Sequence, residues 1–338
     1  MQTKEHRTRV THGDFKRALS VPRLLADEEV LAPLLRWLDE GQEVALVTLV
    51  EVHGGAPREP GSQMAVAGDG RYAGYLSGGC LEMAVVLEAK EAIAEGRNRL
   101  TRYGRGSPYF DVRLPCGSGL DLYFDRAISR EMLTEMLLLR RRRRPFALRT
   151  NLSSGLSQLV EMGAPARRSG RDGHVLERFY VPDIELNLIG GGPSLVAIAV
   201  LAHSMGVDLS VMSHDEATLA ALAASGVIAR IQECQNIDSL GGLDFASGAV
   251  LCFHDHDAEI DLLSELLRSK AFYIGALGNH AVHRERLSLL ARRGFTNSDL
   301  SRIRGPIGVI SGAKSKATLA VGVLAEVLAE AKACNLVP

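Results

Sequence analysis

The stretch from residue 186 to 206 constrains the fold more than any other part of the sequence. A short apolar segment, residues 186–189, runs directly into Gly190, Gly191 and Gly192, and an apolar helical pattern then continues to Gly206. Further short apolar segments follow at residues 207–212, 227–231, 249–253 and 271–274. Short strands that alternate with helices predict a parallel sheet with helices on both faces. We therefore expect an α/β fold whose C-terminal part is a Rossmann-like, doubly wound parallel sheet.

The N-terminal half has a different pattern, because its strands are expected to pair as hairpins. A strand at residues 44–51 is followed by a loop at 52–61, which holds three Gly and two Pro. A hairpin follows at 63–76, and a helix opens near residues 77–80 and ends at Gly96. These features predict an N-terminal α+β domain with hairpins. The expected domains are a flexible extension at 1–23, the α+β domain at 24–180 and the Rossmann-like domain at 181–338.

Charge and cysteine content exclude several classes of protein. The 338 residues carry 39 Lys and Arg against 40 Asp and Glu, so no net field attracts nucleic acid or an anionic membrane. Five adjacent arginines, residues 140–144, spread around a helix end and are expected to be solvated. No apolar run approaches the ~20 residues of a membrane helix, and no secretory signal is recognisable. Five cysteines in a chain of this length fit a reduced, cytoplasmic protein.

The glycine turn at 190–192 matches a dinucleotide-binding fingerprint only in part. Gly190 and Gly192 fit the first two positions, but Leu195 occupies the position of the third small residue. Ser213 and His214 stand where an acidic residue is expected after the second strand. The turn can bind a phosphate at the helix N-terminus, or its glycines can serve packing alone. An NAD(P)-dependent oxidoreductase is therefore one hypothesis for function.

Two cysteines lie on glycine-rich turns. Cys80 follows Gly78 and Gly79 at a predicted helix start, where the helix dipole lowers the pKa of a thiol. Cys116 precedes Gly117 in an irregular segment between strands, where a thiol can be exposed. A small buried cysteine in a tight turn is the alternative for both. A thiol-based carrier of sulfur or redox equivalents is a further hypothesis.

Other candidate binding residues also lie on loops. Arg58 stands on the Gly- and Pro-rich loop, where a guanidinium can hold a phosphate or carboxylate. His254 follows a strand at the carboxyl end of the predicted sheet, although the spacing of the surrounding His and Asp residues suits a metal poorly. Gly275 and Gly278 follow another strand and, with Arg284 and Arg286 on the next helix, form a second candidate anion site.

Taken together, seven segments resemble the XdhC/CoxI family, whose members are maturation factors for xanthine dehydrogenase and related molybdenum hydroxylases. The resemblance extends from about residue 28 to 332. It rests on residues 47–66, 74–82, 115–124, 186–194, 253–256, 273–279 and 305–328.

The resemblance implies a cofactor-binding chaperone and not a catalyst. Such a protein binds the molybdenum cofactor in its molybdopterin form and protects it while a cysteine desulfurase replaces one oxygen on Mo by sulfur. It then delivers the cofactor to a xanthine dehydrogenase-type enzyme, and a homodimer is compatible with this role. The family's cofactor cysteine maps to Cys116 or Cys80, either of which would contact Mo or its sulfido group. We expect both cysteine turns and Gly190 to meet across a cleft between the domains.

Overall fold

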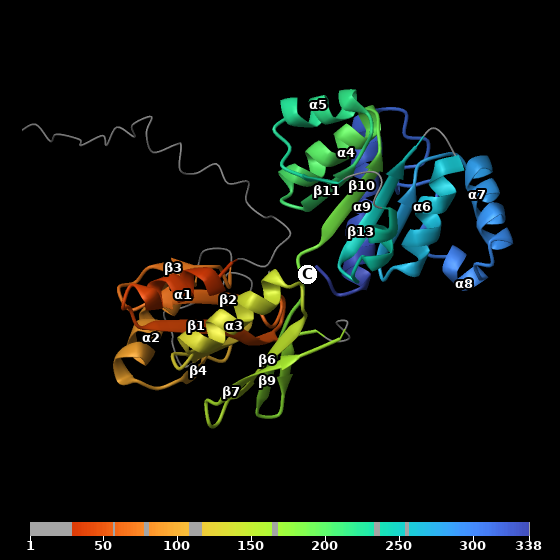
Figure 1. Cartoon of the computed structure of the whole chain (residues 1–338). Helices are drawn as coiled ribbons and strands as arrows, with labels where there is room; N and C mark the ends of the chain where they lie inside the picture. Colours follow the sequence, from red (N-terminus) through yellow and green to blue (C-terminus); the bar gives the residue numbers. More distant parts are fainter. Residues whose placement is uncertain are drawn as a thin grey trace, which may run out of the picture.

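The computed structural model describes residues 29–56, 58–77, 81–107, 117–163, 168–232, 237–253 and 257–337. The chain has an N-terminal part with antiparallel sheets and a C-terminal part with one parallel sheet (Figure 1). This arrangement confirms the fold class expected from the sequence. The N-terminal part ends with a strand at Tyr180, and the C-terminal part begins with a strand at Glu185. The expected extension at 1–23 lies outside the described residues, and the domain boundaries stay a prediction.

The first sheet carries helices on both faces. Its strands are all antiparallel, in the order β3-β2-β1-β5-β4. They are β1 (Val44–His53), β2 (Gln63–Ala67), β3 (Tyr72–Ala73), β4 (Arg99–Gly104) and β5 (Gly119–Asp125). The helix α2 (Glu82–Glu95) packs in one core with β1, β2 and β5. The helices α1 (Leu31–Asp39) and α3 (Arg130–Arg141) share the core on the other face.

A second antiparallel sheet completes the N-terminal part, in the order β7-β6-β9-β8. Its strands are β6 (Phe146–Asn151), β7 (Ser157–Glu161), β8 (Gly170–Asp172) and β9 (Val175–Tyr180). Phe146 stacks on Tyr180 at 4.7 Å between ring centroids, and both rings lie in the core with α1 and α3. The strand β8 consists of Gly170, Arg171 and Asp172, which have no apolar pattern, and only their pairing with β9 makes them a strand.

The C-terminal sheet has six parallel strands in the order β12-β11-β10-β13-β14-β15, which is the strand order of dinucleotide-binding Rossmann folds. The strands are β10 (Glu185–Gly190), β11 (Asp208–Met212), β12 (Arg230–Gln232), β13 (Ser247–Cys252), β14 (Tyr273–Ala276) and β15 (Ile303–Arg304). On one face α4 (Pro193–Ser204) and α9 (Lys316–Ala333) pack together, next to α5 (Glu216–Ala224). On the other face lie α6 (Asp257–Arg268) and α7 (His280–Arg292), with α8 (Asn297–Leu300) and the 3₁₀ helix η2 (Ile237–Gly242).

Local signals explain where the helices begin and end. Ser315 caps α9 by accepting a hydrogen bond from the amide of Thr318. Gly96 ends α2 in the left-handed conformation, as the sequence predicts. Within the described part of the chain, every helix is too short or too polar to cross a lipid bilayer.

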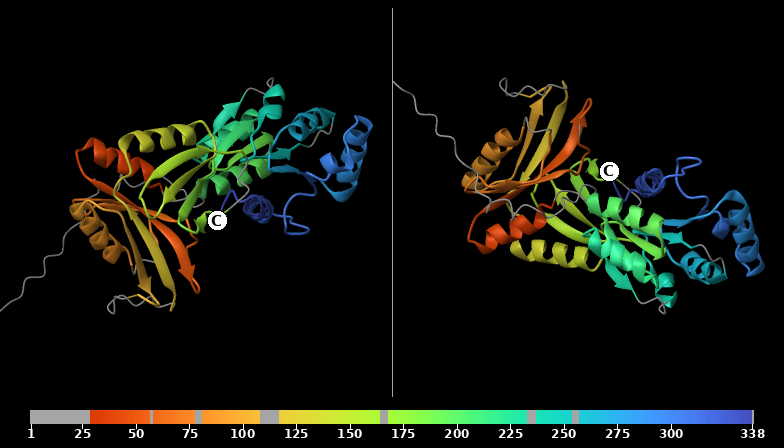
Figure 2. Two further views of the ribbon diagram at one scale, coloured as in Figure 1. Left: turned by 90° about the horizontal axis from the view of Figure 1, so that it is seen from below. Right: turned by 90° about the horizontal axis from the view of Figure 1, so that it is seen from above.

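Arginines of the run at 140–144 connect the two parts of the chain, which lie side by side (Figure 2). Arg143 donates from Nε and Nη2 to the two carboxylate oxygens of Asp244 at 2.6 and 2.9 Å, and from Nη1 to the carbonyl of Asp183 at 3.0 Å. Arg140 lies 3.6 Å from the Asp183 carboxylate. The run is therefore more than the solvated helix end we expected, because its partners are far away in sequence.

Candidate functional site

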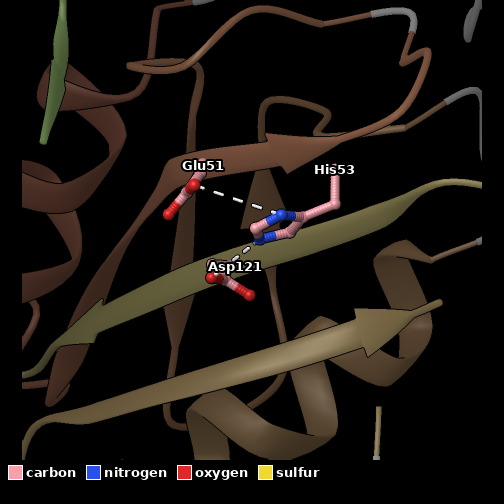
Figure 3. Close-up of side chains that lie close together, drawn as sticks. All are labelled: Glu51, His53 and Asp121. Atoms are coloured by element: carbon pink, nitrogen blue, oxygen red, sulfur yellow. Dashed lines mark hydrogen bonds and ion pairs between the residues drawn. The ribbon is translucent and has the colours of Figure 1, made fainter. Parts of the chain in front are cut away.

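A cluster of charged side chains lies where β1 ends beside β5 and β4 (Figure 3). His53 Nε2 lies 3.1 Å from Asp121 Oδ2 and 2.8 Å from Arg102 Nη2. Arg102 donates from Nε and Nη2 to the two Asp121 oxygens at 2.6 and 2.7 Å. Glu51 approaches the other side of the imidazole, with Oε1 4.0 Å from Nδ1. The cluster thus joins three strands through one imidazole and one guanidinium.

A β-bulge explains why these side chains share a face. Leu49 pairs with Leu122, but the register then shifts and Glu51 pairs with Asp121. Leu49 and Leu122 belong to the core beneath α2. In a regular strand without a bulge at Val50, the alternation of side chains would place Glu51 on that same buried face. The bulge therefore turns Glu51 and His53 toward Asp121, a re-aiming that bulges commonly provide near functional sites.

The guanidinium controls the charge of the cluster. Asp121 is 5% exposed, and this burial disfavours its ionised form. The hydrogen bonds from Arg102 outweigh burial and hold the pKa of Asp121 below its usual value. The hydrogen bond to Asp121 raises the pKa of Arg102 in turn. Because an arginine only donates, His53 Nε2 accepts from Arg102, which assigns the imidazole proton to Nδ1 on the side of Glu51.

The distances and charges in the cluster also indicate whether a metal ion can bind here. Glu51, His53 and Asp121 offer ligand atoms that all lie within 4.8 Å of one another. Arg102, however, already bonds to Asp121 and His53 and adds a positive charge there.

We expect Arg102→Met to tighten Zn²⁺ binding by at least about tenfold, measured by titration with a competing chelator. Arg105→Met is the control, since Arg105 is exposed on the loop after β4. Equal Zn²⁺ affinity in both variants would contradict this interpretation.

A buried carboxylate closes the segment that contains Gly78, Gly79 and Cys80, residues that lie outside the described part of the chain. Glu82 accepts hydrogen bonds from the amides of Leu76, Ser77 and Leu81 at 3.2, 2.9 and 3.1 Å. Glu82 is only 3% exposed. Burial works against its ionisation, but the hydrogen bonds from Ser77 and its neighbours outweigh burial and lower the pKa of Glu82. One carboxylate thus ties together the two ends of this short segment.

The second cysteine segment joins the sheet beside the charged cluster. Cys116 lies outside the described residues. The described part of the chain resumes at Gly117, which has a φ of 67°. Gly119 pairs with both His53 and Gly104. A Cβ at Gly119 would lie 2.5 Å from the carbonyl oxygen of Arg105, so the close pairing requires glycine.

The glycine turn of the Rossmann sheet serves packing. Gly190 has a φ of 114°, and a Cβ there would lie 2.3 Å from the carbonyl oxygen of Cys252. The amide of Gly192 donates to Thr218 Oγ1 at 2.7 Å, and Pro193 has no amide proton. Thr218 Oγ1 donates in turn to Asp215, whose carboxylate places negative charge beside the turn. The turn therefore has fewer amides to offer a phosphate than the sequence suggests.

The second candidate anion site is also explained by packing. Gly275 lies in β14, where a Cβ would come within 2.6 Å of the Tyr273 ring, and Gly278 lies in the loop before α7. Arg286 is not directed at an external anion, because its guanidinium forms a buried ion pair with Glu259 at 2.8 Å. His254 lies outside the described residues.

The predicted site residues therefore fall into separate groups. Arg58 lines a cavity together with Ile184 and Val207, at the amino ends of β10 and β11. Gly190 lies at the carboxyl end of β10, about 17–20 Å along the strand. Gly190 and Gly192 share one turn. Cys80 and Cys116 lie outside the described residues, so the expected meeting of that turn with the two cysteine turns stays a prediction.

Sequence reasoning missed Glu51, Arg102, Asp121 and Glu82 as site residues. The loop after His53 drew attention to glycines and Arg58, whereas Asp121 and Arg102 sit inside strands with no motif around them. The signal that was available for Glu82 was its position two residues after Cys80, at the start of the predicted helix.

Comparison with known proteins agrees with this architecture. The sequence model of the XdhC and CoxI family matches residues 37–104, and that of the XdhC Rossmann domain matches residues 186–327. The chain is 34% identical over 290 residues to the molybdenum cofactor insertion chaperone PaoD of Escherichia coli (strain K12), which covers 86% of this chain and 84% of that protein.

A solved structure has the same fold. It is a Bacillus halodurans protein described as a xanthine dehydrogenase, with a TM-score of 0.69 and 18% identity, and the match covers 90% of this chain and 96% of that one. Because of its low identity, this likeness is evidence for the fold alone. The family matches in both halves and the extensive identity to the Escherichia coli relative confirm the resemblance noted from the sequence: the chain belongs to the XdhC and CoxI family.

Proposed function

We propose that this protein binds the molybdenum cofactor and inserts it into a molybdenum hydroxylase of the xanthine dehydrogenase type. In this role the cofactor is cargo, and the protein holds it while a cysteine desulfurase exchanges one oxygen on Mo for sulfur. The relation to PaoD supports the insertion role, because that relative is named a molybdenum cofactor insertion chaperone and the match spans both halves of the chain. The relative's name does not cover the sulfuration step or a client enzyme of the xanthine dehydrogenase type, and both are further parts of the proposal.

The observation that carries the proposed site is one core shared by the described residues that flank the two cysteine segments. Leu76 and Leu81 flank the segment with Cys80, and Leu120 follows the segment with Cys116. All three leucines pack in one core on the α2 face of the first sheet. Both segments therefore begin or end over the same core, which supports a common cargo site at this end of the sheet.

Residues around these segments have distinct roles in the proposal. A thiolate of Cys116 or Cys80 would hold the cargo through Mo or its sulfido group, since soft sulfur ligands suit such centres. The Glu82 carboxylate fixes the chain ends around Cys80, and the pairing of Gly119 fixes the chain after Cys116. The Arg102–Asp121–His53 cluster sets the position of the strand ends beside them.

The NAD(P)-dependent alternative has less support from the geometry. The amide of Gly192 bonds to Thr218, and the Asp215 carboxylate lies beside the turn where a pyrophosphate would bring further negative charge. We expect NADH and NADPH to leave the melting temperature unchanged, because a ligand stabilises only the folded state that it binds.

The test uses protein expressed in a host that makes the molybdenum cofactor. Mo is measured by elemental analysis, and pterin by fluorescence after oxidative release, in the wild type, Cys116→Ser and Cys80→Ser. We expect near-stoichiometric Mo and pterin in the wild type and a loss of both in one of the two variants. Cys334→Ser is the matched control, because Cys334 is an exposed thiol at the end of α9.

Delivery is tested separately with a molybdenum hydroxylase prepared without its cofactor. Loaded wild-type protein should restore activity of the client, and preincubation with a cysteine desulfurase and cysteine should increase the activity recovered. A wild type that carries neither Mo nor pterin from a competent host would overturn the proposal. Loaded protein that never activates the client would overturn the insertion step alone.

A further inference from the structure

A second site is suggested by the cavity at the junction of the two parts of the chain. Its volume is ≈ 400 Å³, within the range of pockets that hold small organic ligands and larger than an inorganic ion needs. The walls come from the loop Arg58–Gln63, from β9 and the linker after it, and from the C-terminal residues that follow α9. The C-terminus lies at the junction between the two parts (Figure 1). None of these residues belongs to the proposed cargo turns at Cys80 and Cys116.

Positive charge dominates the lining of the cavity. Five cationic residues line it, and only two carboxylates, Glu59 and Asp183, accompany them. Arg168 lies 3.6 Å from Glu59, and Arg140 lies 3.6 Å from Asp183. The lining residues therefore carry a formal excess of three positive charges.

The guanidinium of Arg178 is held in position without a ligand. Arg178 is 9% exposed, and its guanidinium lies 4.6 Å from the centre of the Tyr180 ring. The Tyr180 hydroxyl donates to Gln63 Oε1 at 2.8 Å, and Gln63 Nε2 donates to Thr48 at 3.1 Å. A buried polar chain therefore holds this guanidinium in place, and such preorganisation lowers the entropy lost on binding.

The same loop is held close to the second sheet by Gly61. Its φ is 93°, and a Cβ there would lie 2.4 Å from the Cβ of Ser169. Ser169 Oγ also accepts a hydrogen bond from the amide of Phe179 at 3.0 Å. The loop that carries Arg58 and the strand β9, which carries Arg178, are thus fixed relative to each other within the N-terminal part.

We propose that this cavity binds an organic phosphate. A phosphate monoester carries about −1.5 to −2 charges at pH 7, and a diphosphate carries more, which matches the excess charge better than a carboxylate does. Arginine forks suit phosphate oxygens. Apolar side chains in the lining, among them Val181, Val207 and Leu336, would contact the organic part. Because both parts of the chain contribute walls, the ligand also bridges them.

The first test is a calorimetric titration of full-length protein from a host that makes no molybdenum cofactor. The probes are pyrophosphate, ADP and adenosine. We expect ADP and pyrophosphate to bind with Kd values of about 10–100 µM that weaken with added salt, and adenosine not to bind. ADP that binds more tightly than pyrophosphate assigns the apolar walls to the organic part. Absence of binding by both phosphates at millimolar concentration would overturn the proposal.

Two lysines of α9 supply a matched pair of variants. Lys332 lies at the cavity in the last turn, and the exposed Lys316 lies at the opposite end of the same helix. We expect Lys332→Gln to raise the Kd of ADP about tenfold and Lys316→Gln to leave it unchanged. Equal effects of the two substitutions would overturn the site. Arg178→Gln should weaken binding further, and Lys332→Gln keeps the test valid if that variant fails to fold.

A last experiment distinguishes two sources of the phosphate. It is the only experiment on this cavity that rests on the proposed function. Lys332→Gln is expressed in a host that makes the molybdenum cofactor, and its pterin content is compared with that of Lys316→Gln. A lower pterin content in Lys332→Gln assigns the cavity to the phosphate of the cargo. Equal pterin content, together with weakened ADP binding, assigns it to a free nucleotide.

Discussion

Replacing Arg286 by Met is expected to destabilise the fold by about 4 kcal/mol. Arg286 on α7 and Glu259 on α6 are 2% and 1% exposed, and Arg286 Nη2 donates to the two Glu259 oxygens at 2.8 and 3.0 Å. Met fills much of the volume of the arginine stem but leaves the Glu259 carboxylate buried without its countercharge. Urea denaturation of the full chain, followed by circular dichroism, measures the change.

The same two helices supply the control for this prediction. Arg293 on α7 pairs with Asp261 on α6 at 2.5 Å, but their side chains are 45% and 62% exposed. Arg293→Met should therefore cost less than about 1 kcal/mol. The double variant Arg286→Met, Glu259→Met should recover most of the loss, since it removes the buried charge altogether. A similar cost for Arg286→Met and Arg293→Met would show that burial does not set the strength of this pair.

This prediction also decides between two roles for Arg286. It donates to the carbonyl of Leu277 at 2.8 Å, directly beside Gly278, as well as to Glu259. A guanidinium that held an external anion would contribute to binding and little to stability. The geometry instead makes Arg286 the residue that fixes the loop before α7, and an anion site at Gly275 and Gly278 stays a prediction.

The Rossmann part could be predicted because its signals are local. Buried parallel strands are short apolar runs, and the glycine turn at 190–192 marks the passage from strand to helix. The same pattern does not decide the function, since the carbonyl of Cys252 on the neighbouring strand by itself requires glycine at position 190, with or without a ligand. A glycine pattern indicates that the backbone lies close to another group, and that group can be a neighbouring strand or a ligand.

The N-terminal site could not be predicted, because its residues meet through long-range pairing. Asp121 and Arg102 come together only through the register of β4 and β5, and a single extra residue near Val50 turns Glu51 and His53 toward them. Neither the register nor the bulge has a local sequence signal. The arginine run shows the same limit, since Asp244 lies 101 residues from Arg143.

Glu82→Gln is expected to lower the free energy of unfolding by about 3 kcal/mol and to reduce the cofactor content of the purified protein. The carboxylate accepts from three amides and from the Ser77 hydroxyl. Gln has one acceptor oxygen and no charge, and its NH₂ group faces amide donors that then lack a partner. Ser77 and Leu81, which flank the segment with Cys80, should then no longer be tied to one carboxylate.

The pH dependence of this effect has a definite sign. Folding lowers the pKa of Glu82 below its usual value of 4.5, so its contribution to stability is complete above that value and is lost as the pH falls through the lowered pKa. The gap between wild type and Glu82→Gln should therefore be full at pH 7 and shrink in acid. Glu91→Gln on the same helix is the control, because Glu91 is exposed and its pair with Arg99 contributes less than about 1 kcal/mol. A gap that stays constant from pH 7 to about pH 3 would mean that Glu82 acts through packing and not through its charge.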